Sequence, residues 1–207
     1  RLRIVREADA RGLSHGCVRE EGAHLSPLQQ RAVTTPMTLT REHYHKRVIP
    51  VLRGEFGYAN VMAVPRVAKV VVNVGVGRIR DEKQQSQVAK AIGLITGQKA
   101  APRTAKKAIA AFKTRRGLVV GYQVTLRGKR MWDFLSRLVD IAIPRQRDFH
   151  GLDPASVDQS GNLTIGFKEH IVFPEMISED VPFIFGFEVT VVTSARTRAE
   201  GISLLRA

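Results

Sequence analysis

The chain has 207 residues, of which 43% are hydrophobic, and this is enough for one substantial core in one globular domain. Its 33 Lys and Arg against 19 Asp and Glu give a formal net charge of +14, which indicates a polyanionic partner, either nucleic acid or an acidic membrane. No apolar run approaches the roughly 18 to 20 residues of a membrane span, and the single cysteine, Cys17, excludes an intramolecular disulfide and a cysteine-based metal cage.

Residues 1–36 show neither a helical nor a strand period over any useful length. They carry six Arg and four acidic residues, and this acidic content is untypical of an organelle transit peptide. We predict that they form a disordered extension without a function of its own. A single domain is expected to occupy residues 37–207, with Met37 as its natural start.

Residues 40–56 are predicted to be helical, because their apolar side chains recur at helical spacing. Pro50 should lie at a kink or between two short helical pieces. His43 and His45 are two residues apart and would point to different sides of such a helix. A shared metal site is therefore not expected there, and both histidines are interpreted as surface residues.

Residues 66–74 are predicted to form a strand, because their side chains alternate between two faces. One face is apolar and belongs to the core, whereas the other presents the cation of Lys69 and the amide of Asn73. A helix is expected at about 81–95, where apolar residues again recur at helical spacing, and Gly97 is a natural stop for it.

The positive charge is concentrated in residues 83–132, which contain twelve Lys and Arg and no Asp or Glu, and which supply +12 of the net +14. A solvated helix face normally carries both signs at i, i+4 spacing, so the missing acids favour a segment that lies against a polyanion. Within this segment, residues 99–117 are predicted to form a long projecting basic loop. The segment's aromatic residues are only Phe112, Tyr122 and Trp132, so contact with the backbone and grooves of a folded RNA is favoured over stacking on single-stranded bases.

The next predicted strand, 118–127, alternates apolar residues with Gln123, Thr125 and Arg127. Together with the strand at 66–74, it places donors for phosphates, and amide or hydroxyl groups for sugars and base edges, on faces away from the core. We therefore predict an RNA-binding surface on the sheet face opposite to the helices.

The rest of the chain mixes strands and helices without a regular repeat. An apolar helix is expected at 129–142, ending before Pro144, followed by strands at 163–167 and 187–194 and by a terminal helix. Because no βαβ series occurs, the pattern predicts an α+β fold in one domain, with a largely antiparallel sheet and helices on one of its faces.

Two features could suggest an enzyme. Gly75 and Gly77 follow a strand and precede a helix, as in a dinucleotide-binding turn, but Arg80 stands where the third glycine belongs and no acid follows about twenty residues later, which favours a structural turn. Four ionisable residues also gather in one polar loop: Arg147, Asp148, His150 and Asp153. No nucleophile or metal-ligand spacing accompanies them, so we expect no catalytic residue, no metal and no cofactor.

Seven separated motifs occur in an order that closely resembles the family of large-subunit ribosomal protein five, in its bacterial and organellar form. The motifs are Val61–Val67, Asn73–Gly77, Thr96–Lys99, Ala111–Lys113, Val124–Gly128, Arg130–Trp132 and Pro144–Phe149. The resemblance covers about 38–207. It implies a non-enzymatic ribosomal component. The expected location is the ribosome of the bacterial cytoplasm or of an organelle.

The family resemblance further implies an α+β domain that grips a loop of 5S ribosomal RNA, helps to dock it into the central protuberance, and projects a basic loop towards the transfer RNA in the peptidyl site. The resemblance implies further partners: large-subunit ribosomal RNA, neighbouring 5S-binding proteins and a small-subunit head protein across an intersubunit bridge. It implies no membrane partner. The motifs carry the 5S-facing role onto Lys69, Asn73, Gln98, Lys99, Thr125 and Arg127. The cations of the loop facing transfer RNA are Arg103, Lys106, Lys107, Lys113, Arg115 and Arg116.

Two other classes of function compete with this interpretation. A free-standing basic RNA chaperone or regulatory binder would have the same composition, but the ordered motifs argue against it. A nucleotide-dependent oxidoreductase rests on the two glycines of the 75–77 turn and lacks the third. The sequence also departs from the family pattern, with Ala63 where Gln is usual, and with Phe185, Gly186 and Phe187 in place of a more charged neighbourhood.

Overall fold

The computed structural model describes residues 41–79, 81–147, 149–176 and 183–207. The extension predicted for residues 1–36 lies outside these ranges, as do Arg80 and Asp148. The described part of the chain contains five strands that form one sheet in the order β2-β3-β1-β5-β4. The strands are β1 (Val67–Gly75), β2 (Ala101–Thr104), β3 (Val119–Leu126), β4 (Leu163–Phe167) and β5 (Phe187–Thr193).

All neighbouring strands in the sheet are antiparallel, as predicted. The alternation along β1 assigns its faces correctly from Val70 onward, because Val70, Val72 and Val74 are buried, whereas Ala68, which was expected on the same face, lies at a register shift and is exposed. The pairing continues this face across the sheet, with Val72 opposite both Val124 and Val189. Period-two alternation therefore indicated in advance which side of β1 and β3 would be covered.

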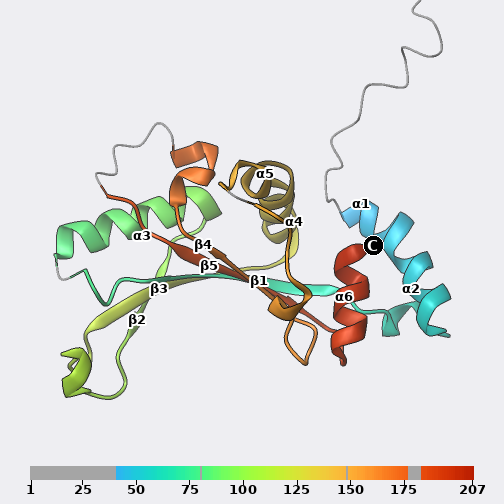
Figure 1. The fold of residues 1–207 in the computed structure, drawn as a ribbon, viewed down its shortest axis with the longest axis horizontal. Coiled ribbons are helices and arrows are strands. Elements are labelled where there is room, and N and C mark those ends of the chain that lie inside the picture. Colours follow the sequence, from blue (N-terminus) through green and yellow to red (C-terminus); the bar gives the residue numbers. More distant parts are fainter. Residues whose placement is uncertain (1–40, 80, 148, 177–182) are drawn as a thin grey trace, which may run out of the picture. The chain divides into compact units, whose positions relative to one another are not determined.

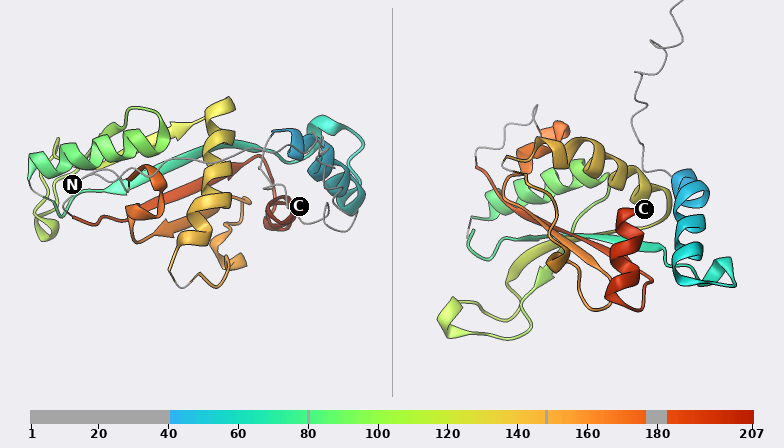
Figure 2. Two further views of the ribbon diagram at one scale, coloured as in Figure 1. Left: turned by 90° about the horizontal axis from the view of Figure 1, so that it is seen from above. Right: turned by 45° about the vertical axis from the view of Figure 1, so that its right-hand side comes forward.

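The helices that cover this apolar face are α3 (Glu82–Thr96) and α4 (Gly128–Arg137), and both lie on the same side of the sheet in Figures 1 and 2. The carboxylate of Asp81 caps α3 by accepting from the Lys83 N–H at 3.0 Å, and Gly97 ends it in the left-handed conformation. Helix α4 continues through the π-turn η5 (Leu138–Ala142) into α5 (Ile143–Arg145). The α+β class with helices on one face is confirmed.

The remaining helical pieces lie before the sheet, in its connections and at the end of the chain. Before the sheet come α1 (Arg41–His43), the π-turn η2 (Tyr44–Val48), α2 (Ile49–Phe56) and the short 3-10 turn η3 (Val61–Ala63). Further 3-10 turns are η4 (Ala110–Phe112), η6 (Pro154–Ser156), η7 (His170–Val172) and η8 (Pro174–Met176), and the chain ends in α6 (Arg198–Arg206). Pro50 lies in the first turn of α2, where its missing N–H is tolerated.

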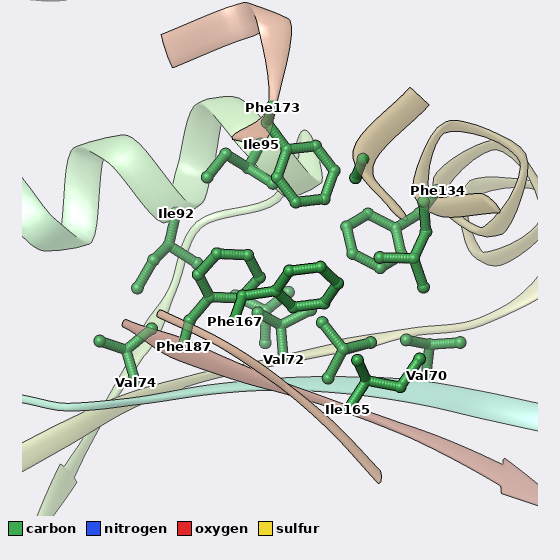
Figure 3. Close-up of a cluster of buried hydrophobic side chains, with 14 of the residues drawn as sticks. Val70, Val72, Val74, Ile92, Ile95, Phe134, Ile165, Phe167, Phe173 and Phe187 are labelled. Carbon is green, nitrogen blue, oxygen red and sulfur yellow. The ribbon is translucent and has the colours of Figure 1, made fainter. Parts of the chain in front are cut away.

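The main core lies between the sheet and the helices α3 and α4 (Figure 3). Aromatic rings fill its centre: Phe167 stacks on Phe187 with ring centroids 4.9 Å apart, and Phe134 stacks on Phe173 at 5.8 Å. Helix α3 contributes aliphatic side chains to the same cluster, Ile92 among them. This packing holds the central strands rigidly from one side and leaves the other side of the sheet for another role.

A second, smaller core joins the helical pieces at the two ends of the described chain. Its buried members are Tyr44, Val48, Leu52, Val64 and Leu204. The hydroxyl of Tyr44 donates to the carbonyl oxygen of Pro65 at 2.9 Å, which ties η2 to the segment that enters β1. Residues 44, 48 and 52 therefore form a packed stripe at the predicted helical spacing, whereas Val51 and Phe56, which share that spacing, are exposed.

Candidate nucleic-acid interface

The face of the sheet opposite to α3 and α4 is lined mostly by polar side chains from three strands, with Val71 among them. We call it the open face, and its central members are Lys69, Val71, Asn73, Gln123, Thr125, Glu188 and Thr190. Val71 lies between Thr125 and Thr190, and the next row places Asn73 between Gln123 and Glu188. No described helix covers the centre of this face in Figure 1, and Asn73 and Glu188 are exposed.

The structure places three of the six predicted 5S-facing residues on the strand faces that the alternation expected, whereas Arg127, which was expected on the strand, lies just beyond it as the N-cap of α4. Lys69 and Asn73 lie on the open-face side of β1, Thr125 lies on that side of β3, and Arg127 follows β3 directly. The other two, Gln98 and Lys99, lie between the end of α3 and the start of β2, at the edge of the sheet. Lys99 is exposed and Gln98 is half-buried.

Arg103 is the one loop cation whose predicted location is wrong. It lies in the edge strand β2 rather than in the projecting loop, opposite Gly121 of β3. Its Nε donates to the Gln123 side-chain oxygen at 2.7 Å, which directs the guanidinium over the open face. A strand of four residues is too short for its alternation to be detected in a sequence, and Pro102 is tolerated in it because β2 is an edge strand.

Glu188 and Thr190 are open-face residues that the sequence analysis missed. The signal was available, because β5 alternates like β1, with Val189 and Val191 buried and the residues between them more exposed. Glu188 is opposite Asn73 and adds a carboxylate to a surface whose other polar groups are cations, amides and hydroxyls. A carboxylate can accept hydrogen bonds from base amino groups or ribose hydroxyls, so the face offers both donors and acceptors.

Residues 105–118 form an ordered hairpin between β2 and β3, which projects away from the sheet in Figure 1. Ile109 and Thr114 exchange two backbone hydrogen bonds of 3.2 Å, and Ala105 N–H donates to the Leu118 carbonyl at 2.8 Å. Its five cations are exposed: Lys106, Lys107, Lys113, Arg115 and Arg116. None of them forms an ion pair with a carboxylate of the described residues.

Comparison with known proteins shows to which family the chain is similar. A family model described as ribosomal protein L5 matches residues 60–115, and a second, described as the C-terminus of the same ribosomal protein family, matches residues 119–207. The chain belongs to the ribosomal protein L5 family. The large ribosomal subunit protein uL5 of Halothermothrix orenii is 48% identical over 171 residues, which are 82% of this chain and 96% of that protein.

Two further uL5 proteins show the same extent of similarity. The uL5 protein of Desulfotalea psychrophila is 44% identical over 171 residues, 82% of this chain and 96% of its own length. That of Mycoplasma pneumoniae is 46% identical over 172 residues, with coverage of 83% and 96%. Members of the family are structural, non-enzymatic constituents of the large ribosomal subunit, and the bacterial relatives indicate the bacterial type of ribosome.

Two features could have suggested an enzyme, the glycine turn at 75–77 and the polar loop at 147–153. Both have structural roles here, which agrees with membership of the L5 family. After the Gly75 turn, Val76 N–H donates to the Val120 carbonyl at 2.9 Å, so this turn extends the pairing of β1 with β3. In the polar loop, the Asp153 carboxylate accepts from the Ala155 N–H at 2.8 Å and caps η6. No group of potential metal ligands occurs among the described residues, and no helix there is long and apolar enough to cross a bilayer.

Proposed function

We propose that this L5 family member binds 5S ribosomal RNA through the open face and contacts transfer RNA in the peptidyl site through the hairpin 105–118. The observation that carries the proposal is the presence of a polar, helix-free sheet face beside an unpaired basic hairpin on one rigid fold. Structured RNA requires both kinds of contact, because hydrogen bonds to edges and hydroxyls select it while phosphate contacts hold it.

The open face suits a shape-specific grip because its side chains stand on strands fixed by the core. Asn73 lies between the buried residues Val72 and Val74 of β1, and Thr125 lies between Val124 and Leu126 of β3. Such side chains lose little conformational freedom when an RNA loop binds. Lys69 and Arg127 supply cations for phosphates at the same end of this surface. Gln98 and Lys99 extend it beyond the β2 edge.

The hairpin suits a longer-range contact with a phosphate backbone. Its five cations are exposed and unopposed within the described structure, so an approaching polyanion meets undiminished positive charge. Arg103, which lies at its base, would belong to both surfaces. Contacts to large-subunit ribosomal RNA, to neighbouring 5S-binding proteins and to a small-subunit head protein across the subunit interface complete the proposed assembly.

The proposal predicts that the two surfaces can be disabled separately. Replacing Asn73 or Thr125 with Ala should weaken 5S RNA binding by about 5- to 150-fold, which corresponds to the roughly 1 to 3 kcal/mol of a lost, well-placed hydrogen-bonding group. Replacing Lys107, Lys113 and Arg115 with Gln should keep 5S binding within about tenfold, a loss of at most about 1.4 kcal/mol, while weakening peptidyl-site transfer-RNA retention.

The measurements are the 5S affinity of each purified variant in a gel-shift titration and the transfer-RNA retention of ribosomes that carry it. Arg47→Gln is the matched control, because Arg47 is an exposed cation on η2 outside both surfaces. A hairpin variant that loses 5S RNA as strongly as the Asn73 variant would show that the hairpin belongs to the anchor. Open-face variants with unchanged 5S affinity would refute the assignment of this face.

A further inference from the structure

Phe112 is an aromatic side chain that the described residues leave largely uncovered. It lies at the tip of the hairpin 105–118, in the 3-10 turn η4, and 75% of its surface is exposed. The other described phenylalanines that are exposed, Phe149 and Phe56, have exposures of 37% and 36%. Exposure of an apolar ring of this size to water is unfavourable, and its burial against another surface is favourable.

The backbone of the tip holds this ring in a defined position. The Lys113 N–H donates to the Ala110 carbonyl at 2.9 Å and closes the turn, and the Ile109–Thr114 pair beneath it fixes the two arms. Lys113 adopts the left-handed conformation with φ of 51°, a conformation uncommon for a side-chain-bearing residue. Phe112 is therefore presented by an ordered turn, and binding through it would not require the whole hairpin to fold first.

The surroundings of the ring identify the kind of surface that would cover it. Five exposed cations belong to the same hairpin, and no acidic residue occurs in residues 83–132. A nucleobase has this combination of properties, because it offers a flat π-face and is joined to phosphates on both sides. An anionic bilayer would also attract the cations, but membrane binding of this kind uses a broad apolar face, whereas the hairpin tip exposes, of large apolar side chains, only the Phe112 ring and part of Ile109.

We propose that Phe112 is a base-stacking residue, whose ring covers the exposed face of a nucleobase in the RNA that the hairpin contacts. The inference rests on the proposed function of the hairpin and adds a contact of different physics to it. The cations act on phosphates and weaken with salt, whereas stacking depends on the ring and changes little with salt. The exposed base belongs either to transfer RNA or to ribosomal RNA, and both sources present the same chemistry.

The test compares side chains at position 112 on ribosomes that carry the variant protein. Phe112→Leu keeps apolar volume without a ring, and Phe112→Trp keeps a ring. We expect Phe112→Leu to weaken transfer-RNA retention by about 5- to 150-fold, the effect of losing one base–aromatic stack, and Phe112→Trp to stay close to the natural protein. Because the side chain is exposed, neither change should alter the melting temperature of the isolated protein.

A salt titration separates stacking from charge. Phe112→Leu should lower the affinity of the ribosomes for transfer RNA without changing the slope of log affinity against log salt concentration. Lys107→Gln should make that slope less steep. Met62→Ala is the matched control: Met62 is 78% exposed but lies in η3, before the first residue of β1, at the opposite end of that strand from the hairpin. It should leave the retention unchanged.

The outcomes distinguish this inference from the proposed function. If Phe112→Leu behaves like the natural protein while the Gln variants lose transfer RNA, stacking on transfer RNA is refuted and the electrostatic contact stands. If neither change affects RNA binding, the proposed hairpin contact fails as well. Binding of the free protein to phosphatidylserine vesicles that is abolished by Phe112→Leu, without any effect on ribosomes, would overturn the inference in favour of a membrane.

Zero-length ultraviolet crosslinking identifies which RNA supplies the base. Ribosomes with the natural protein should yield a crosslink between the 111–113 peptide and one nucleotide, and this crosslink should disappear in Phe112→Leu and persist in Phe112→Trp. A nucleotide of transfer RNA supports both the stacking role and the proposed function. A ribosomal RNA nucleotide supports the stacking role but refutes transfer RNA as the source of the base, and crosslinking that survives Phe112→Leu refutes the stacking role.

Discussion

Gly201 lies in the first turns of α6 at a point where the structure has no room for a methyl group. A Cβ atom built there would lie 2.4 Å from the Gly161 Cα and 2.7 Å from the Gly161 carbonyl oxygen. Both neighbours are backbone atoms, so no flexible side chain can move aside. Replacement of Gly201 by Ala should therefore force α6 away from the turn that contains Gly161.

The Gly161 turn is itself firmly held. Its carbonyl oxygen accepts from the Thr193 hydroxyl at 2.9 Å, and the Asp158 carboxylate accepts from the Asn162 backbone N–H at 2.7 Å. The displaced element would thus be α6, whose Leu204 belongs to the second core with Tyr44. The change should loosen the packing of the N-terminal helical pieces as well as that of α6.

The magnitude follows from two opposing effects. Overpacking of a tight contact costs about 1 to 3 kcal/mol, whereas Ala is favoured over Gly inside a helix by about 1 kcal/mol. At an overlap as close as 2.4 Å the steric cost should dominate, with a net loss of about 1 to 2 kcal/mol. For a domain of this size the melting temperature should fall by roughly 2 to 8 °C.

Gly54 provides the matched comparison. It also lies within a helix, α2, but a Cβ there would meet nothing within 4 Å. Gly54→Ala should therefore stabilise the protein by about 0.5 to 1 kcal/mol through helix propensity alone. Thermal and urea denaturation of both variants would decide the point, and a Gly201→Ala protein that is as stabilised as the Gly54→Ala protein would refute the steric reasoning.

Three further predictions concern charge and helix capping. The affinity for 5S RNA should fall with salt at a log–log slope of roughly −0.7 to −0.9 per neutralised phosphate, measured by fluorescence anisotropy, and a slope near zero would contradict the electrostatic account. At the start of α6, Thr197 and Glu200 form a capping box, so Thr197→Ala should cost about 1 kcal/mol in urea denaturation, and an unchanged midpoint would argue against the cap. The hydrogen bond from the backbone N–H of Arg196 holds the pKa of Glu200 below its usual range. The stability that the Glu200 carboxylate contributes to the fold is therefore complete above the unfolded-state pKa of glutamate, and it is lost as the pH falls through the lower folded-state pKa. Melting temperatures between pH 7 and pH 3 should therefore fall less for Glu200→Gln than for the natural protein.

The sequence alone was sufficient wherever the determining signal is local. Alternation along β1 and β3 identified the faces of Asn73 and Thr125, because a strand turns successive side chains to opposite sides. The bounds of α3 followed from an apolar stripe and from Gly97, which can adopt the left-handed conformation that ends a helix. The acid-free segment pointed to a polyanion by charge alone.

Other features depend on residues that are distant in the sequence, and these only the tertiary structure decided. Arg103 contributes to the open face because β2 pairs with β3. This pairing cannot be predicted from the sequence of β2, which is only four residues long and contains a proline. Glu188 lies beside Asn73 although 115 positions separate them, and Gly201 meets Gly161 across 40 positions.

Phe112 shows the same division at a single residue. Its sequence neighbourhood is basic and weakly apolar, which is compatible with a ring that packs under the hairpin or with one that projects from its tip. Local patterns determine which element a side chain belongs to and which way it points. Whether that side chain is then covered depends on elements brought beside it by strand pairing and core packing, and at the hairpin tip none of the described elements covers it.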